Sequence, residues 1–380
     1  MANTLTAILP VLASAMQTVS RERVGCIASV STNFDQKMAG AGQTIHIPVG
    51  PTRSAATFTP AMAATAGTDA TALSADLVLS NNQWAGFNLS GEDDRTMLSG
   101  GGDVRASWFE QMVAQSIRAV VNAIEVGTAT ALKQGASRAA GAAGTAPFGT
   151  NFNEATAVRK ILVDNGAPAT DLSLVLDTTA SANYLQRVTA LSISDAAAGE
   201  TFRNAILGNT FGMAVRESAG IAVHTKGTGT LYVTSGSTAP GVSDIALVTG
   251  SGTVLAGDVV TFAADANNKY VINTGVAAPG TITLGRPGAR VTIATANALT
   301  VGNNFTANVA LYKGAAVLAV RPTALPVGGQ VDDYSVVTDP VSGLSLGFAR
   351  LVGDGMVSYR IHAVWQAKVV NPEQVAILMG

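Results

Sequence analysis

Apolar and polar positions alternate with two different periods along this chain, and the longest regular stretch covers residues 103–134. Its apolar side chains recur at steps of three, four and seven residues, at Phe109, Val113, Ile117, Val120, Ile124 and Ala131. That spacing places them on one face of an α-helix. Polar residues recur in the same way on the opposite face, at Gln111, Gln115, Arg118, Asn122 and Glu125. The pattern predicts a helix with one buried and one solvent-exposed face.

The ends of this predicted helix carry their own signals. Asp103 follows a run of three glycines and suits a helix start, and Gly135 suits a stop. At 1.5 Å per residue the helix would be about 48 Å long, which is more than a compact domain of ordinary size needs. We interpret it as a strut across an extended subunit, and the alternative is an ordinary core helix.

The first 43 residues read as an N-terminal arm. Their apolar residues fall on one helical face, with Pro10 kinking that helix or lying in its first turn: Leu5, Ile8, Leu12, Met16 and Val19. A short terminal helix of this kind must dock on the body of the chain or on a neighbour. Ala13-Ser14-Ala15 resembles a signal-peptide cleavage site, but no basic residue precedes Arg21, so we expect no signal peptide.

Residues 44–90 change to a period of two, which indicates β-strands. Ile45, Ile47 and Val49 form one alternating run, and residues 73–79 form another. The segment between them consists almost entirely of Ala, Thr, Ser and Gly, so it predicts the soft tip of a long two-stranded hairpin arm. Because an isolated hairpin is marginally stable in water, this arm should lie on another surface.

The remaining regions follow from similar patterns. Residues 91–150 form a peripheral domain around the long helix and end in an Ala/Gly-rich hinge at 136–150. Residues 151–226 read as an axial α/β domain, with helices at 154–164 and 178–188 and strands at 172–176 and 220–224. Residues 227–308 carry six short alternating runs separated by Gly or Asn, which predicts an inserted small β-barrel or sandwich. Residues 309–380 supply return strands at 311–320, a hairpin at 344–365 and a last strand at 375–378.

Composition narrows the class of protein. Charged residues make up 13% of the 380 residues, against about 25% in typical soluble proteins. Low charge with 40 glycines fits a subunit whose surface is mostly covered by neighbours, or a secreted β-rich surface protein. The net charge of −2 provides no general basic field for tight nucleic-acid binding. The single cysteine, Cys26, excludes an internal disulfide, and no segment has the roughly 20 apolar residues that span a bilayer.

Candidate chemistry is sparse. His46, His224 and His362 lie far apart in strand-like patterns, and neither they nor Cys26 have partners at metal-ligand spacing. The acidic run at 92–94 favours a solvated helix start over a metal site. Phosphate-binding loops of the GxxxxGK type and GxSxG elbows are absent from the sequence. We therefore expect no enzyme activity, no catalytic, cofactor-binding or metal residues, and no cofactor.

The order of these elements resembles that of the major capsid proteins of tailed double-stranded-DNA phages, which share the Hong Kong 97-type fold. The local resemblance is to the subgroup typified by a short-tailed Salmonella phage, which carries an inserted β-domain. It rests on residues 1–6 and 19–22 in the arm, 256–262 in the insertion, and 311–313 with 319–322 in the re-entering strand. It covers nearly the whole chain, and the order of elements carries more of it than any single motif.

The resemblance implies an α+β, Hong Kong 97-like capsid fold and a structural function in the virion. Many copies would assemble as hexamers and pentamers into an icosahedral shell around packaged DNA, which the shell would contact non-specifically. Assembly in the host bacterial cytoplasm, a scaffolding protein, a portal and possibly a decoration protein are further implied partners and circumstances. No membrane partner is implied.

Some relatives cross-link their arms through a lysine and an asparagine. The hairpin at 44–90 contains no lysine, and Arg53 is its one basic residue, so we expect no such cross-link. Two other classes stay open: an encapsulin-type nanocompartment, which shares the fold but would lack the β-insertion, and a secreted adhesin, which would need an export signal and no long helix.

Overall fold

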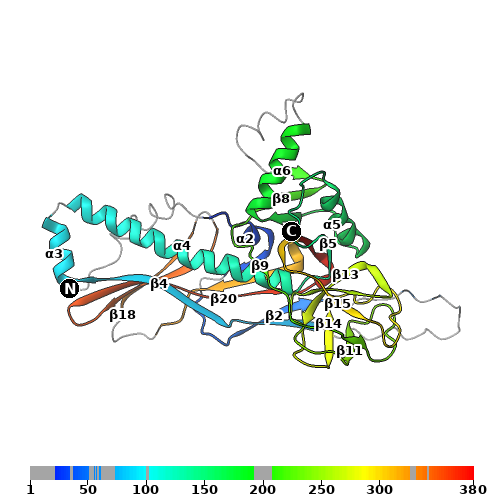
Figure 1. The fold of residues 1–380 in the computed structure, drawn as a ribbon. Helices are drawn as coiled ribbons and strands as arrows, with labels where there is room; N and C mark the ends of the chain where they lie inside the picture. The colour runs from blue at the N-terminus through cyan, green and yellow to red at the C-terminus, as the bar shows by residue number, and fades with distance from the viewer. Residues whose placement is uncertain are drawn as a thin grey trace.

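The chain has an elongated α+β fold, with the long helix α4 lying along one sheet and a second, larger sheet at its far end (Figure 1). The computed structural model describes residues 22–34, 37–50, 55, 57, 60, 73–99, 102–191, 208–325, 331–339 and 342–380. The predicted N-terminal helix and the hairpin tip lie outside the described residues.

Helix α4 spans Gly102–Gln134, so the predicted helix at 103–134 is confirmed. It packs on a six-stranded sheet with the order β1-β17-β20-β19-β18, in which β4 pairs with β20. The strands are β1 (Ser31–Phe34), β4 (Asn81–Ser90), β17 (Ala316–Arg321), β18 (Val331–Thr338), β19 (Ser345–Val352) and β20 (Met356–Val369). The expected hairpin at 344–365 is the β19–β20 pair.

The contact between α4 and this sheet depends on aromatic side chains and one glycine. Phe109 of α4 packs edge-on against Phe87 of β4 and Tyr359 of β20, with ring centroids 5.5 and 4.9 Å apart. Further along α4, Gly127 faces Trp365 so closely that an added Cβ would lie 1.9 Å from the indole ring. The missing side chain at Gly127 therefore lets the helix approach the sheet.

Helix α3 (Gly91–Ser99) precedes α4 and starts with the acidic run, as predicted. Ser90 and Asp93 cap its first turn reciprocally: the Ser90 hydroxyl donates to the Asp93 carboxylate at 2.6 Å, and the Asp93 backbone N–H donates to the Ser90 hydroxyl at 3.1 Å. Carboxylates in the first turn also favour the positive end of the helix dipole.

Strands β2 (Thr44–Val49) and β3 (Leu73–Val78) form the predicted two-stranded hairpin, paired from Thr44↔Val78 to Val49↔Leu73. The base of the hairpin packs on its own chain, where Leu77 and Leu79 are buried with Ala319 and Val364. The arm therefore has an anchored base within the subunit.

The second sheet has mixed parallel and antiparallel pairs, and it includes the region between 136 and 226. Its central order is β5-β21-β16-β6-β8-β7, with helices α5 and α6 packed nearby. These elements are β5 (Arg138–Gly141), α5 (Asn153–Asp164), β6 (Leu172–Leu176), α6 (Thr178–Leu191), β7 (Asn209–Thr210), β8 (Met213–Glu217), β9 (Val223–His224), β16 (Phe305–Tyr312) and β21 (Val375–Met379). The expected helices and the strands at 172–176 and 375–378 are present.

Residues 233–301 add short strands with a separate hydrophobic core that contains Tyr232, Phe262, Tyr270 and Ile282. The strands are β10 (Val233–Thr234), β11 (Asp244–Val248), β12 (Val259–Phe262), β13 (Asp265–Thr274), β14 (Thr281–Leu284) and β15 (Leu299–Val301). Strand β13 pairs with both β14 and β5, so these strands continue the second sheet. We refer to residues 233–301 as the β-unit.

Several expectations from the sequence were wrong in detail. The expected strand at 220–224 is only the two-residue strand β9 at Val223–His224. The expected hinge at 136–150 contains β5, because Arg138 and Ala139 pair with both β13 and β21. Residues 311–320 form parts of two strands, separated by a 3-10 turn at Lys313–Ala315. The expected run at 291–293 forms only an isolated bridge, and the strand of that region lies at 299–301.

Candidate assembly elements

The residues that the sequence offered for chemistry lie in three separate places. His46 pairs with Asp76 across the exposed face of the hairpin, at 2.7 Å. His224 lies buried against Asp258, with 2.8 Å between Nε2 and Oδ1. His362 is buried on strand β20, where burial and the nearby Arg360 lower its pKa to about 4. Each histidine thus serves a different local structure, and the fold brings none of them together.

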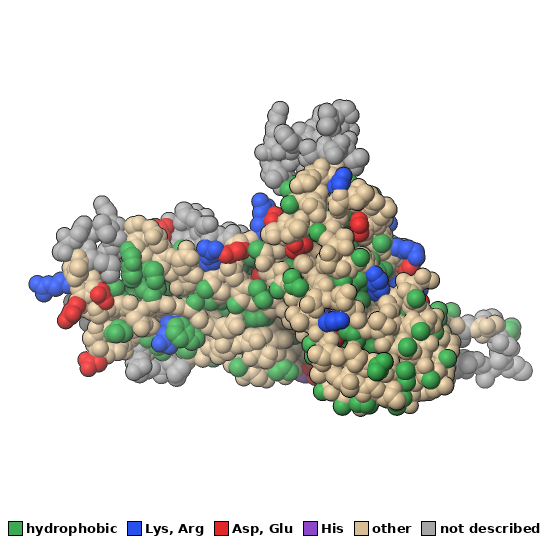
Figure 2. All heavy atoms as spheres, in the orientation of Figure 1, with side chains coloured by type: hydrophobic (Ala, Val, Ile, Leu, Met, Phe, Trp, Pro, Cys, Tyr) green, Lys and Arg blue, Asp and Glu red, His purple; other side chains and the backbone are tan. Residues whose placement is uncertain are grey.

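The described part of the chain contains no group of three or more His, Cys, Asp or Glu residues placed to hold a metal ion. Among the same residues, no helix is both long and apolar enough to cross a bilayer. Figure 2 shows charged side chains spread over the visible face, whereas the part of this face that belongs to the β-unit is largely uncharged and carries scattered hydrophobic side chains.

The segment entering the body at residue 22 is fixed to the polar side of α4 by charged hydrogen bonds. Arg118 donates through Nε to the Glu22 carboxylate at 2.8 Å, and Asn122 donates to the same carboxylate at 2.5 Å. Hydrogen bonds from Arg118 and Asn122 lower the pKa of Glu22 to about 2. The carboxylate is therefore ionised at neutral pH and holds the root of the N-terminal segment on the helix.

One turn along α4, Glu125 is buried and anchors the short helix α2 (Gly25–Ser29). Its two carboxylate oxygens accept the backbone N–H groups of Cys26 and Ile27 at 2.7 and 2.9 Å, and it also accepts the Ser218 hydroxyl at 2.6 Å. A carboxylate at a helix start satisfies N–H groups that have no partner within the helix. Glu125 thereby joins α4, α2 and the end of β8.

The polar face of α4 is therefore not uniformly solvent-exposed, which corrects the sequence-based expectation. Gln111 and Gln115 are exposed, whereas Glu125 is only 2% exposed and Arg118 is half-buried. The helical spacing of these residues predicts a polar face but not its burial. Glu125 is buried because α2, whose Cys26 and Ile27 are 99 and 98 residues away in the sequence, packs against it.

The β-unit is anchored to the rest of the chain by Asp258. Its carboxylate accepts the backbone N–H groups of Leu255 at 2.7 Å and Gly227 at 3.1 Å, and it pairs with His224 of β9. Lys133, near the end of α4, lies close to Gly257 and interacts electrostatically with Asp258. This buried cluster thus connects the β-unit to both β9 and α4.

The hairpin has one apolar face and one polar face. Leu77 at its base is buried, and Ile45 and Ile47 pack partly on the same cluster. Val49, further out on this face, is half-buried and does not belong to that cluster. Val78 lies on the opposite face and is 46% exposed. The apolar face therefore extends from the base of the arm at Leu77 out to Val49.

No protein-family model matches the sequence, and no curated protein matches it. Solved structures do resemble the chain over nearly its full length. The capsid of cyanophage P-SCSP1u is 12% identical, with 95% of this chain and 89% of that chain covered and a TM-score of 0.49. The mature capsid of bacteriophage PhiM1 is 12% identical, with 92% and 85% covered and a TM-score of 0.45. A virus-like particle from Pyrococcus furiosus is 9% identical, with 97% and 96% covered and a TM-score of 0.42.

All three form viral or virus-like shells. At these low identities, the role of each residue has to be inferred from the contacts that it makes in this chain. Sequence patterns identified the hairpin and α4. They did not predict that Glu22 and Asp258 anchor parts of the chain, and they predicted that Glu125 is exposed, although it is buried. Those residues act through long-range pairs, which a local period does not contain.

Proposed function

We propose that this chain is a major capsid protein, which self-assembles in hexamers and pentamers into an icosahedral shell that encloses packaged phage DNA. The observation that carries the proposal is the two-stranded hairpin arm, which is anchored at its base on its own chain and has one apolar face that extends out to Val49. A two-stranded arm with an apolar face is a liability in a monomer and provides a contact in an assembly. The role is structural, and no catalytic step is needed for it.

The rest of the subunit supports the same proposal. Helix α4 and the six-stranded sheet form a stiff, extended body, which suits a subunit of a shell better than a compact soluble monomer. The low charge of the chain suits a surface that neighbouring copies cover, and a container that holds DNA without binding it tightly. Within this proposal the fold is of the Hong Kong 97 type, and residues 227–308, which contain the β-unit, form an inserted domain.

The partners and circumstances follow from the same proposal. Packaged DNA is contacted non-specifically, and a scaffolding protein and a portal take part in assembly in the host cytoplasm. A decoration protein is a further possible partner of the mature shell. Because the hairpin carries no lysine, contacts between arms are non-covalent, and mature shells should give single-chain bands on a denaturing gel.

The proposal is tested with a matched pair of hairpin variants. Val49→Asp places a charge on the apolar face of the arm, and Val78→Asp places the same charge on the opposite, exposed face. We expect the parent chain and Val78→Asp to form shells or capsomer-sized rings in negative-stain microscopy. Val49→Asp should stay small by light scattering while keeping the circular-dichroism spectrum of the parent chain.

A compact parent chain whose mass does not change with concentration would contradict the shell function. Equal assembly of Val49→Asp and Val78→Asp would contradict the role given to the hairpin.

A further inference from the structure

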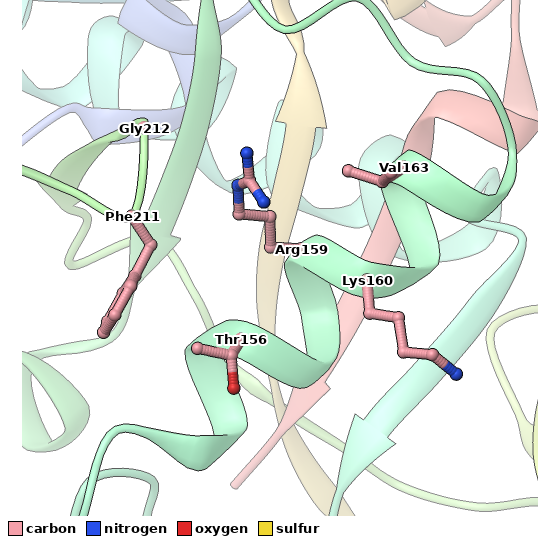
Figure 3. A pocket seen from close by; sticks show the side chains of 6 residues that line it. All are labelled: Thr156, Arg159, Lys160, Val163, Phe211 and Gly212. Carbon is pink, nitrogen blue, oxygen red and sulfur yellow. The ribbon is translucent and has the colours of Figure 1, made fainter.

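A cavity of about 450 Å³ opens between helix α5 and the turn that joins β7 to β8 (Figure 3). In this view Arg159 and Val163 of α5 lie on one side of the cavity, and Phe211 and Gly212 of the turn lie on the other. Among the residues that the structure describes, the lining consists of Thr156, Arg159, Lys160, Val163, Phe211 and Gly212. These six residues include two cationic side chains and no acidic one.

Arg159 is the polar centre of this cavity. Its Nε atom is buried without a hydrogen-bond acceptor, and its guanidinium makes no ion pair with the residues that the structure describes. Lys160 lies at the edge, 77% exposed, with its ammonium 3.8 Å from Asp164. A guanidinium presents a planar fork of donors that matches a carboxylate, and leaving it unpaired near buried surface is unfavourable. The charge balance therefore favours an anionic ligand.

The other wall is apolar, and its conformation is strained. Phe211 and Gly212 form the two-residue turn between β7 and β8, with φ of +54° and +73°. Such a turn favours Asn or Gly at its first position, because a side chain in the left-handed region costs about 1–2 kcal/mol. Phe211 is nevertheless 41% exposed, and its ring lies 6.0 Å from that of Phe152. The turn thus holds an aromatic ring at the cavity despite the strain.

We propose that this cavity is a binding site for a carboxylate attached to an apolar group. The carboxylate pairs with Arg159, and the apolar group packs against Phe211 and Val163, of which Val163 is 52% exposed. A bare phosphate would pair with the cation but would leave this apolar wall unused. The carboxylate can come from a free small molecule or from a side chain of another copy of this chain. The site goes beyond the proposed shell function and does not depend on it.

The test uses benzoate and its uncharged analogue benzamide, titrated onto the purified full-length chain and followed by saturation-transfer difference NMR. We expect millimolar binding of benzoate and about tenfold weaker binding of benzamide, since the charged pair is lost. Arg159→Gln should reduce benzoate binding to the benzamide level, and Arg159→Lys should restore part of it. Arg95→Gln, which removes an exposed cation on the distant helix α3, is the matched control and should bind like the parent chain.

Phe211→Asn separates binding from folding. Asn suits the first position of this turn, so the melting temperature should stay equal or rise, whereas binding of both benzoate and benzamide should weaken about fivefold. Benzoate binding that is equal in Arg159→Gln and the parent chain overturns the proposal. So does the absence of any saturable signal at high-millimolar benzoate.

The two sources of the carboxylate are then distinguished on assembled and unassembled protein. A side chain of a neighbouring copy would occupy the site in particles, so benzoate would bind them at least tenfold more weakly than the unassembled chain. A free small molecule leaves the affinity equal in the two states. Because binding is measured on the unassembled chain as well, failure of this proposal is distinguishable from failure of the shell function.

Discussion

Gly127 shows how a single missing side chain sets the distance between the long helix and its sheet. On helix propensity alone, Gly127→Ala would stabilise α4 by about 1 kcal/mol. The added Cβ would meet the ring of Trp365 at 1.9 Å, however, and Trp365 is itself buried. We expect a net loss of about 1–3 kcal/mol in the free energy of unfolding, measured by urea denaturation.

Gly91→Ala is the matched control, because an added Cβ at Gly91 meets nothing within 4 Å. Its effect should stay within about 0.5 kcal/mol of the parent chain. If Gly127→Ala and Gly91→Ala change the unfolding free energy equally, the close approach of α4 to Trp365 is not what requires glycine at position 127.

His362 should make the free energy of unfolding depend on pH in the acidic range. Burial, together with Arg360, lowers its pKa from 6.5 to about 4, so the folded chain binds fewer protons than the unfolded chain between these values. The contribution of His362 to stability is therefore fully present above pH 6.5 and is lost as pH falls toward 4. We expect His362→Leu to flatten the decline in unfolding free energy between pH 6.5 and 4, by as much as about 3 kcal/mol.

The measurement is urea denaturation of both proteins at pH 7, 6, 5 and 4. His46→Leu is the control, because His46 lies on the exposed hairpin face, 68% exposed beside Asp76. Parallel pH curves for His362→Leu and the parent chain would contradict the argument.

At the scale of elements, α2 and α4 are joined by one buried carboxylate. Glu125→Gln keeps the size of the side chain but replaces one of its two acceptor oxygens with an amide N–H₂, which then faces at least one of the donors on Cys26, Ile27 and Ser218. Leaving such donors unpaired in a buried site is costly, so we expect a loss of about 2–4 kcal/mol in unfolding free energy. Hydrogen exchange at residues 25–30 should rise by a larger factor than in β20.

Gln115→Ala tests whether any polar substitution on that face of α4 has this effect. Gln115 is exposed on the same helix, and its replacement should change stability by less than about 0.5 kcal/mol. Exchange in α2 that is the same in Glu125→Gln and the parent chain would show that other contacts hold the segment.

At the scale of the molecule, the subunit is organised around several cores and two projecting elements. The largest core lies between α4 and its sheet, a second lies around α5 and β6, and the β-unit has a third. Buried polar groups join these parts: Glu125 connects α2 to α4 and β8, and Asp258 connects the β-unit to β9. Such links between the cores keep the relative positions of these parts fixed, as the proposed shell requires of its subunit.

Local pattern alone determined the elements that have one continuous apolar face. Helix α4, the β2–β3 hairpin, the helices α5 and α6 and the β19–β20 pair could all be read from their periods, because one face of each packs on a core. Strand β5 could not, since Arg138–Gly141 has no apolar alternation and becomes a strand by pairing with β13 and β21. The same holds for β1, which pairs in parallel with β17.

Tertiary structure alone decided which polar side chains are buried and what they hold. Glu125 has the same local spacing as the exposed Gln111 and Gln115, yet it is buried because α2 and Ser218 meet it from distant parts of the chain. The cavity at Arg159 depends in the same way on the turn at Phe211, about 50 residues later. The spacing of residues along the sequence determines on which face of its own helix or strand a side chain lies. The residues that this side chain contacts depend on how the helices and strands pack together.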